Sequence, residues 1–133
     1  MAPVSGPLKP LRWPRAWLAL WVLALVVVWV LCLVSLPPVD LPSGSDKVEH
    51  FIAYFVLAAS GVQVFQGRRA LLWMAVGLVA MGVAIEAAQA ALTATRVADV
   101  HDVLANTLGV LAGTALAATP LGNLLLRWVP ARR

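Results

Sequence analysis

Charged residues are scarce in this chain: Asp, Glu, Lys and Arg together make up 12% of its 133 residues. That share is about half of what a soluble globular domain carries. A soluble chain of this size must cover a large surface with polar groups, because small domains bury only about 60–70% of their accessible area. The shortage of charge therefore excludes an ordinary water-soluble domain.

Cysteine is equally scarce, since Cys32 is the only one in the sequence. A single cysteine excludes a disulfide framework and a cysteine-based zinc site. Disorder is excluded as well, because 62% of the residues are hydrophobic and a disordered chain needs low hydrophobicity. The net charge of +4 does not predict nucleic-acid binding, because that function requires basic residues gathered on a soluble face.

Long uncharged stretches are what the sequence has in abundance. Residues 16–39 carry no charge, and a helix at 16–36 would span roughly 30 Å, enough to cross the hydrocarbon core of a bilayer. The stretch is too long for the apolar part of a typical signal peptide, and it lacks a small-x-small cleavage site. We expect a membrane-spanning helix here that ends at Pro37-Pro38.

Three further apolar segments follow, at 47–66, 70–92 and 102–119. None of them shows the alternation of polar and apolar residues that is typical of strands. We therefore predict an all-α protein with a four-helix transmembrane bundle at 16–119. A basic N-terminal segment at 1–15 precedes the bundle, and a basic C-terminal tail at 120–133 follows it.

The distribution of charge between the loops predicts the orientation. Eight of the ten basic residues, and none of the six acids, lie in the N-terminal segment, in the turn after residue 66 and in the C-terminal tail. Cytoplasmic segments of membrane proteins carry an excess of Lys and Arg. Four crossings also place both termini on one side. We therefore expect a multi-pass protein of the plasma membrane with both termini cytoplasmic.

The second and fourth segments each carry a polar stripe on the outer side. The second begins with a carboxylate, an imidazole and a phenol at four-residue spacing, beside a lysine: Asp46, His50, Tyr54 and Lys47. The fourth begins with two acids and an amide at helical spacing, after an arginine: Asp99, Asp102, Asn106 and Arg96. Taken singly, Asp46 and Asp99 are also typical of helix caps, and Tyr54 of an interfacial aromatic residue. Taken together, the two stripes predict a shared site.

The third segment adds Glu86 and Gln89, which are three residues apart and share a helix face. Glu86 lies about 24 Å along its helix, in the outer third of a hydrocarbon core roughly 30 Å thick. An ionisable group at that depth is costly unless it faces protein or water. We expect it to face a polar cavity, with a basic partner from Arg96, Lys47 or His50, or to be protonated and bonded to Gln89.

These residues, in this order, resemble the VanZ-like family of bacterial membrane proteins. The resemblance covers residues 25–119 and rests on Asp46-Lys47-x-x-His50-Phe51-x-x-Tyr54, Glu86-x-x-Gln89 and Arg96-x-x-Asp99-x-x-Asp102-x-x-x-Asn106-x-x-Gly109. The chain departs from the family pattern at Leu92-Thr93-Ala94-Thr95, where a longer turn with glycine or proline is usual. The resemblance implies a small multi-helix protein of the bacterial inner membrane, in a family with a member associated with low-level resistance to the glycopeptide teicoplanin. It implies no reaction.

Two classes of function fit these features. The first is an outer-leaflet site that binds or modifies an envelope lipid or a lipid-linked cell-wall precursor. Arg96 and Lys47 would hold its phosphate or carboxylate. Acid–base chemistry would fall to Glu86, Asp102 and His50. The remaining contacts to the substrate would come from Asp46, Tyr54, Gln89, Asp99 and Asn106.

The second class is non-enzymatic: an accessory or assembly protein whose polar cluster clamps the helices together. A small transporter is a weaker alternative, because no acidic residue on the inner half continues a path. We expect no cofactor and no metal, although a site of His50, Asp46, Glu86 and Asp102 would suit Mg²⁺ or Mn²⁺ better than zinc. The expected partners are membrane lipids, and the sequence leaves open whether the protein forms a homo-oligomer.

Overall fold

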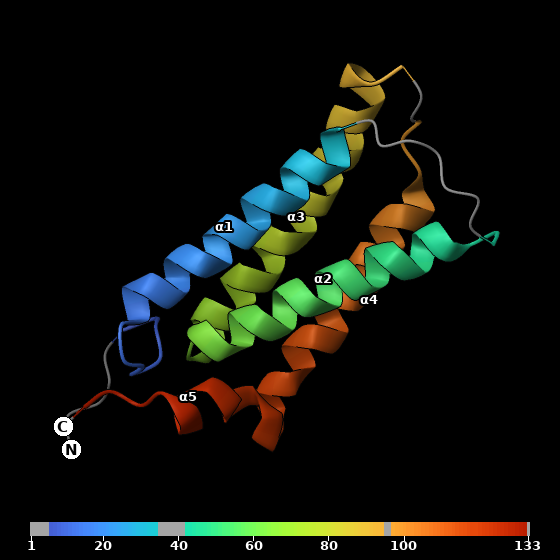
Figure 1. Ribbon diagram of the computed structural model, residues 1–133. Helices are drawn as coiled ribbons and strands as arrows, with labels where there is room; N and C mark the ends of the chain where they lie inside the picture. Colours follow the sequence, from blue (N-terminus) through green and yellow to red (C-terminus); the bar gives the residue numbers. More distant parts are fainter. Residues whose placement is uncertain (1–5, 35–41, 95–96, 133) are drawn as a thin grey trace.

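The computed structural model describes residues 6–34, 42–94 and 97–132 (Figure 1). Its elements are, in order, α1 (Pro14–Leu33), α2 (Ser45–Val64), α3 (Arg68–Leu92), α4 (Val100–Ala115), the 3₁₀ turns η1 (Leu116–Ala118) and η2 (Pro120–Asn123), and α5 (Leu124–Trp128). The described residues form no strand; their only β-type pairing consists of two isolated β-bridges. The prediction of an all-α protein is therefore confirmed. The expected end of the first helix at Pro37-Pro38 lies outside the described residues.

Three stretches of the described chain are long and apolar enough to cross a membrane: α1, α3 and the continuous stretch Val100–Ala118. No residue of α1 is buried within the protein, as suits a helix that faces lipid. α2 is also 20 residues long, but the charged residues of its first turns, Asp46, Lys47 and Glu49, make it less apolar. A fourth crossing by α2 thus remains a prediction.

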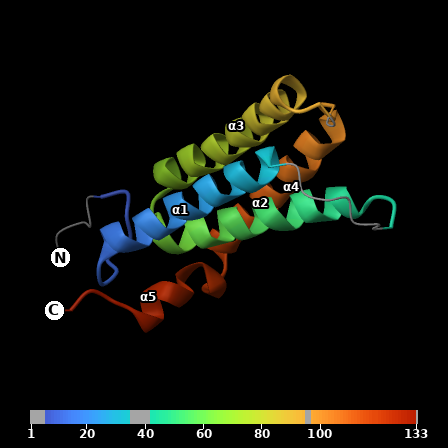
Figure 2. The same ribbon diagram turned by 45° about the horizontal axis from the view of Figure 1, so that its top comes forward.

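Consecutive long helices run in opposite directions, so α1 and α3 point one way and α2 and α4 the other (Figure 1 and Figure 2). The described N-terminal and C-terminal segments lie at one end of the molecule, together with the turn between α2 and α3; we name this the terminal end. The C-terminal end of α3 and the N-terminal ends of α2 and α4 lie at the opposite end, the far end. The acidic residues of the described chain are all carried on segments near the far end.

α2 and α4 make the closest helix pair, because two glycines of α4 let the backbones approach. A Cβ atom at Gly109 would collide with the carbonyl oxygen of Phe51, and one at Gly113 with that of Phe55. Small residues four apart are the usual means of bringing two membrane helices together. The apolar core lies beside this contact and contains Tyr54, Leu57, Ala58, Val62, Met74, Leu78 and Val110.

α1 is attached to α2 through a tryptophan. The indole N–H of Trp21 donates to the carbonyl oxygen of Leu57 at 2.9 Å, and its ring packs edge-on against Phe65, with centroids 5.1 Å apart. Buried indole groups usually find such a partner, since their apolar ring and polar N–H must both be satisfied.

Residues 6–12, within the basic N-terminal segment, form a strap across the terminal end. The Lys9 amide donates to the Val64 carbonyl oxygen at 2.9 Å, and the Arg12 amide donates to that of Val129, also at 2.9 Å. The Lys9 side chain is buried, and its ammonium donates to the carbonyl oxygen of Gly122. The strap therefore joins the end of α2 to the C-terminal tail.

Candidate functional site

Lys47 connects α2 to α4 at the far end of the molecule. Its ammonium lies 2.6 Å from Asp102 Oδ1 and 2.8 Å from Asp99 Oδ2. A third carboxylate, that of the exposed Asp46, lies 3.1 Å away. The lysine that was expected to hold a ligand's anionic group is therefore surrounded by the chain's own carboxylates.

Asp99 forms the N-cap of α4 and takes part in the cluster at the same time. Its Oδ1 accepts from the backbone N–H of His101 at 2.8 Å, which satisfies one of the free amides of the first turn. The hydrogen bond from Lys47, reinforced by those from His101, holds the pKa of the Asp99 carboxyl well below its usual range. Asp99 is therefore a cap and an ionised group facing Lys47.

His50 is oriented by Asn106, which is 2% exposed. The imidazole Nδ1 lies 3.0 Å from Asn106 Oδ1. An amide oxygen only accepts hydrogen bonds, so Nδ1 carries the proton and donates. The other ring nitrogen, Nε2, faces Asp102 Oδ2 at 3.7 Å.

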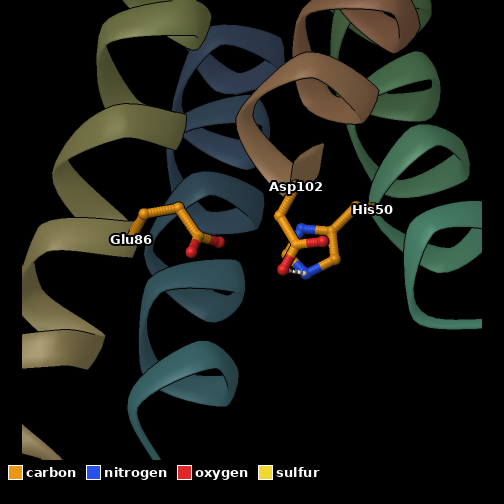
Figure 3. A group of neighbouring side chains, drawn as sticks. All are labelled: His50, Glu86 and Asp102. Carbon is orange, nitrogen blue, oxygen red and sulfur yellow. Dashed lines mark ion pairs between the residues drawn. The ribbon is translucent and has the colours of Figure 1, made fainter. Parts of the chain in front are cut away.

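Glu86 brings α3 into the cluster. It is 4% exposed, and its Oε2 accepts from the backbone N–H of Asp99 at 3.2 Å. Its Oε1 is buried without a hydrogen-bond partner among the described residues. Figure 3 shows this carboxylate pointing toward Asp102 and His50. Within the described part of the chain, the hydrogen-bond partner of Glu86 is thus a backbone amide before α4, a group that no side-chain pattern reveals.

Gln89 and Tyr54 lie apart from this charged group. Gln89 donates to the carbonyl oxygen of Cys32 at 2.8 Å and so joins α3 to α1, whereas the sequence offered Glu86 as its partner. Tyr54 is 2% exposed, and its hydroxyl has no hydrogen-bond partner in the described part of the chain. It is a core residue of α2, not an exposed interfacial one.

Of the other expected site residues, Arg96 lies outside the described residues. Asp46 contacts the cluster only at its exposed rim, through Lys47. The structure thus brings together six of the expected residues, from three helices: Lys47 and His50 of α2, Glu86 of α3, and Asp99, Asp102 and Asn106 at the start of α4.

Gly82 is a residue of this region that the sequence analysis missed. A Cβ atom there would lie 3.1 Å from Asn106 Nδ2 and 3.4 Å from the Tyr54 hydroxyl. The absent side chain gives Asn106 the room it needs beside α3. The available signal was spacing, because Gly82 precedes Glu86 by one helical turn and shares its face.

The charges in the cluster do not balance within the described chain. Three carboxylates, those of Asp46, Asp99 and Asp102, surround the ammonium of Lys47, and a fourth, that of Glu86, lies beside His50 and Asp102. Such a group offers hydrogen-bond acceptors in excess. It suits a ligand that supplies donors or positive charge, and His50 beside Glu86 offers a base and an acid for proton transfer.

The fold and this cluster define a small all-helical membrane protein with a buried polar site near one end of its long helices. Within that class, the chain belongs to the VanZ/LLP1 family, whose profile matches residues 10–125. The match confirms the resemblance to VanZ-like proteins that the motifs indicated. The comparisons found no significant match among curated proteins or among solved structures.

Proposed function

We propose that this chain crosses the bacterial plasma membrane four times, with both termini in the cytoplasm. Four antiparallel helices support this topology, since they place both termini at the terminal end (Figure 1). The N-terminal strap, the start of α3 and α5 carry basic residues at that end. Cytoplasmic segments are enriched in Lys and Arg, so the terminal end faces inward and the polar cluster faces outward.

We propose further that the cluster binds the head group of an envelope lipid or a lipid-linked cell-wall precursor. The observation that carries this proposal is the buried Glu86 carboxylate, which points toward His50 and Asp102 between three helices (Figure 3). A site at this depth lies beside the head groups of the outer leaflet. Hydroxyl and amine groups of such a ligand would donate to the excess carboxylate oxygens.

The energetics of membrane helices favour a ligand over packing alone. An ionisable side chain near the centre of a membrane helix costs about 2.5–3.5 kcal/mol. Polar contacts between membrane helices contribute about 0.6 kcal/mol each on average. The hydrogen bond from the Asp99 amide is the one that Glu86 accepts among the described residues, and it offsets only part of the cost of keeping this carboxylate. A bound head group would supply the missing stabilisation.

Low-level resistance to teicoplanin is the biological role that the resemblance to VanZ-like proteins suggests. A protein that binds or modifies a cell-wall precursor at the outer surface would change the form or the amount of precursor that is accessible to a glycopeptide. In this proposal His50, Glu86 and Asp102 form the reactive centre, and Asn106 and Lys47 hold it in place.

The proposal is tested by the lipids that the protein retains. The wild type and Glu86→Gln would be purified in a mild detergent, and their co-purifying lipids compared by mass spectrometry. We expect a lipid that is enriched on the wild type and lost from Glu86→Gln. Glu49→Gln makes the same change in charge at an exposed position of α2 and should retain the lipid. Identical lipid profiles in all three proteins would contradict the proposal.

A purely structural role is the second candidate, and the contacts between helices favour it. Lys47 bridges α2 and α4, and Gln89 bridges α3 and α1. Under this alternative, Glu86→Gln and Asp102→Asn would lower the midpoint of thermal unfolding by many degrees. A midpoint within a degree or two of the wild type, with lipid retention lost, would instead favour a binding site.

A further inference from the structure

Three acceptor atoms from three different helices meet at the centre of the cluster. The side chains of His50, Glu86 and Asp102 each offer one ligand atom, and these atoms all lie within 4.8 Å of one another. Figure 3 shows the three side chains converging from α2, α3 and α4. Acceptor atoms this close together repel one another unless a positive charge lies between them.

The tautomer of His50 leaves one ring nitrogen free to accept a cation. Its Nδ1 donates to Asn106 Oδ1, 3.0 Å away, so the neutral ring has a lone pair on Nε2. That lone pair faces Asp102 Oδ2 at 3.7 Å, and the other oxygen of the same carboxylate is occupied by Lys47. Two acceptors that face each other repel unless a cation or a proton lies between them.

Glu86 provides an independent observation that points to a ligand. The residue is 4% exposed, its Oε2 is occupied by the Asp99 amide, and its Oε1 has no hydrogen-bond partner in the described part of the chain. A buried carboxylate oxygen without a partner is strongly destabilising. This oxygen belongs to a carboxylate that points into the same gap as His50 and Asp102 (Figure 3).

We propose that a divalent metal cation binds between His50 Nε2, Glu86 Oε1 and Asp102 Oδ2. Asn106 would act as the outer partner that metal-binding histidines usually have, fixing the ring so that Nε2 faces the metal. Lys47 would hold the second oxygen of Asp102 in the same way. A cation bonded at about 2.1 Å separates its ligand atoms by about 3–4 Å, so small side-chain movements complete the site.

One imidazole nitrogen and two carboxylate oxygens suit Mn²⁺, one of the two ions that the sequence favoured over zinc. From the sequence we expected no metal, although His50, Asp46, Glu86 and Asp102 were possible ligands; in the structure Asp46 lies at the exposed rim, outside the group of three. Only the packing of α3 against α4 brings Glu86 to the other two.

The metal would form part of the proposed head-group site, so the biological role of the metal rests on the proposed function. Three protein ligands leave coordination positions open, and catalytic metal sites characteristically keep such a position for water or substrate. A phosphate oxygen of the head group would take it. The cation would thereby let an anionic head group bind beside a cluster that is otherwise rich in carboxylates.

The test measures metal binding directly. Full-length protein in detergent would be stripped with EDTA and titrated with Mn²⁺, and the free Mn²⁺ followed by electron paramagnetic resonance. We expect one Mn²⁺ per wild-type chain, with affinity lowered at least about tenfold in both Glu86→Gln and His50→Gln. Glu49→Gln, the matched control on the exposed face of α2, should bind as the wild type does.

Wild-type protein without saturable binding would overturn the metal site, and so would an equal loss in Glu49→Gln and Glu86→Gln. A second readout covers a variant that folds poorly. Saturating Mn²⁺ should raise the thermal midpoint of the wild type and of Glu49→Gln and leave that of His50→Gln unchanged; an equal rise in all three would also overturn it. Lipid retention without Mn²⁺ binding would contradict only the metal site. Mn²⁺ binding without lipid retention would contradict only the proposed function.

Discussion

The Asn106 side chain orients His50 within the polar cluster although it carries no charge. It is fully enclosed between α2, α3 and α4, where Gly82 leaves room for its amide nitrogen and His50 donates to its oxygen. Buried amides of this kind specify one arrangement of their neighbours, because every alternative leaves a polar group unsatisfied. One neutral residue therefore determines which nitrogen of His50 faces Asp102.

Asn106→Leu should destabilise the protein by about 1–3 kcal/mol, because the buried imidazole loses its acceptor. Thermal or denaturant unfolding in detergent would measure the loss. Thr107→Val is the matched control, since Thr107 donates only to the Val103 carbonyl of its own helix, and it should change stability by less than about 1 kcal/mol. Equal effects of the two substitutions would show that Asn106 has no special role.

At the scale of elements, the position of the cluster depends on how closely α2 and α4 approach. Gly109 and Gly113 face the α2 backbone at Phe51 and Phe55, one turn and two turns below Asn106 along α4. This contact sets the separation of the two helices that supply Lys47, His50 and Asp102. A wider separation would break the Lys47–Asp102 contact of 2.6 Å.

Gly109→Ala should therefore destabilise the protein, by about 1–3 kcal/mol, since an added methyl group overpacks a tight contact. Gly77→Ala on α3 is the matched control, because a Cβ there meets nothing within 4 Å. Alanine is the better helix former by about 1 kcal/mol, so the control should be neutral or stabilising. The midpoint of thermal unfolding should fall for Gly109→Ala and stay the same or rise for Gly77→Ala; a comparable fall in both would contradict this account of the contact.

The N-terminal strap makes a second element-scale prediction, through Lys9. Burial lowers the pKa of its ammonium from the ordinary value of 10.5. Between the folded and unfolded pKa values the unfolded chain binds more protons, so stability rises as the pH rises through that window. We expect the unfolding free energy of the wild type to increase relative to that of Lys9→Arg as the pH rises toward 10.5.

Arginine stays charged throughout this pH range, so the variant lacks the gain. The measurement is denaturant unfolding in detergent at several pH values. A constant difference between the two proteins would show that the Lys9 ammonium is not penalised by burial.

For the molecule as a whole, the sequence predicted the all-helical class and which polar side chains of the second and fourth segments meet, but not the backbone contacts that join the helices. A membrane helix satisfies its own backbone, so length and hydropathy mark it without knowledge of its neighbours. Lys47, His50, Asp102 and Asn106 were also expected together, because their spacing puts them on helix faces at a common depth.

The contacts that escaped prediction involve backbone groups. Glu86 accepts from the Asp99 amide, and Gln89 donates to the Cys32 carbonyl. The strap of residues 6–12 is likewise attached through backbone amides. Every residue carries a backbone carbonyl, and every residue except proline an N–H, so side-chain identity contains almost no signal of which amide or carbonyl is used. Only the three-dimensional packing decides it.

The orientation of the whole molecule can be tested with two matched cysteines in a Cys32→Ala background. Gly44 and Gly67 are both exposed, both have positive φ values of 86° and 82°, and a side chain at either meets nothing within 4 Å. We expect Gly44→Cys to react with an impermeant maleimide in intact spheroplasts, and Gly67→Cys only after lysis. The reverse pattern would invert the proposed topology.

The strap also determines when the molecule can be completed during its synthesis. Lys9 and its acceptor Gly122 are 113 residues apart, so the buried lysine precedes its partner through almost the whole of translation. At about 5–20 residues per second, that interval is about 6–23 s. The Lys9 amide can bond to Val64 once α2 is made, but the Lys9 ammonium and the Arg12 amide gain their acceptors, Gly122 and Val129, only with the C-terminal tail. Joining the strap to the tail is therefore a late step of assembly, and a chain truncated before η2 would leave the Lys9 ammonium without this acceptor.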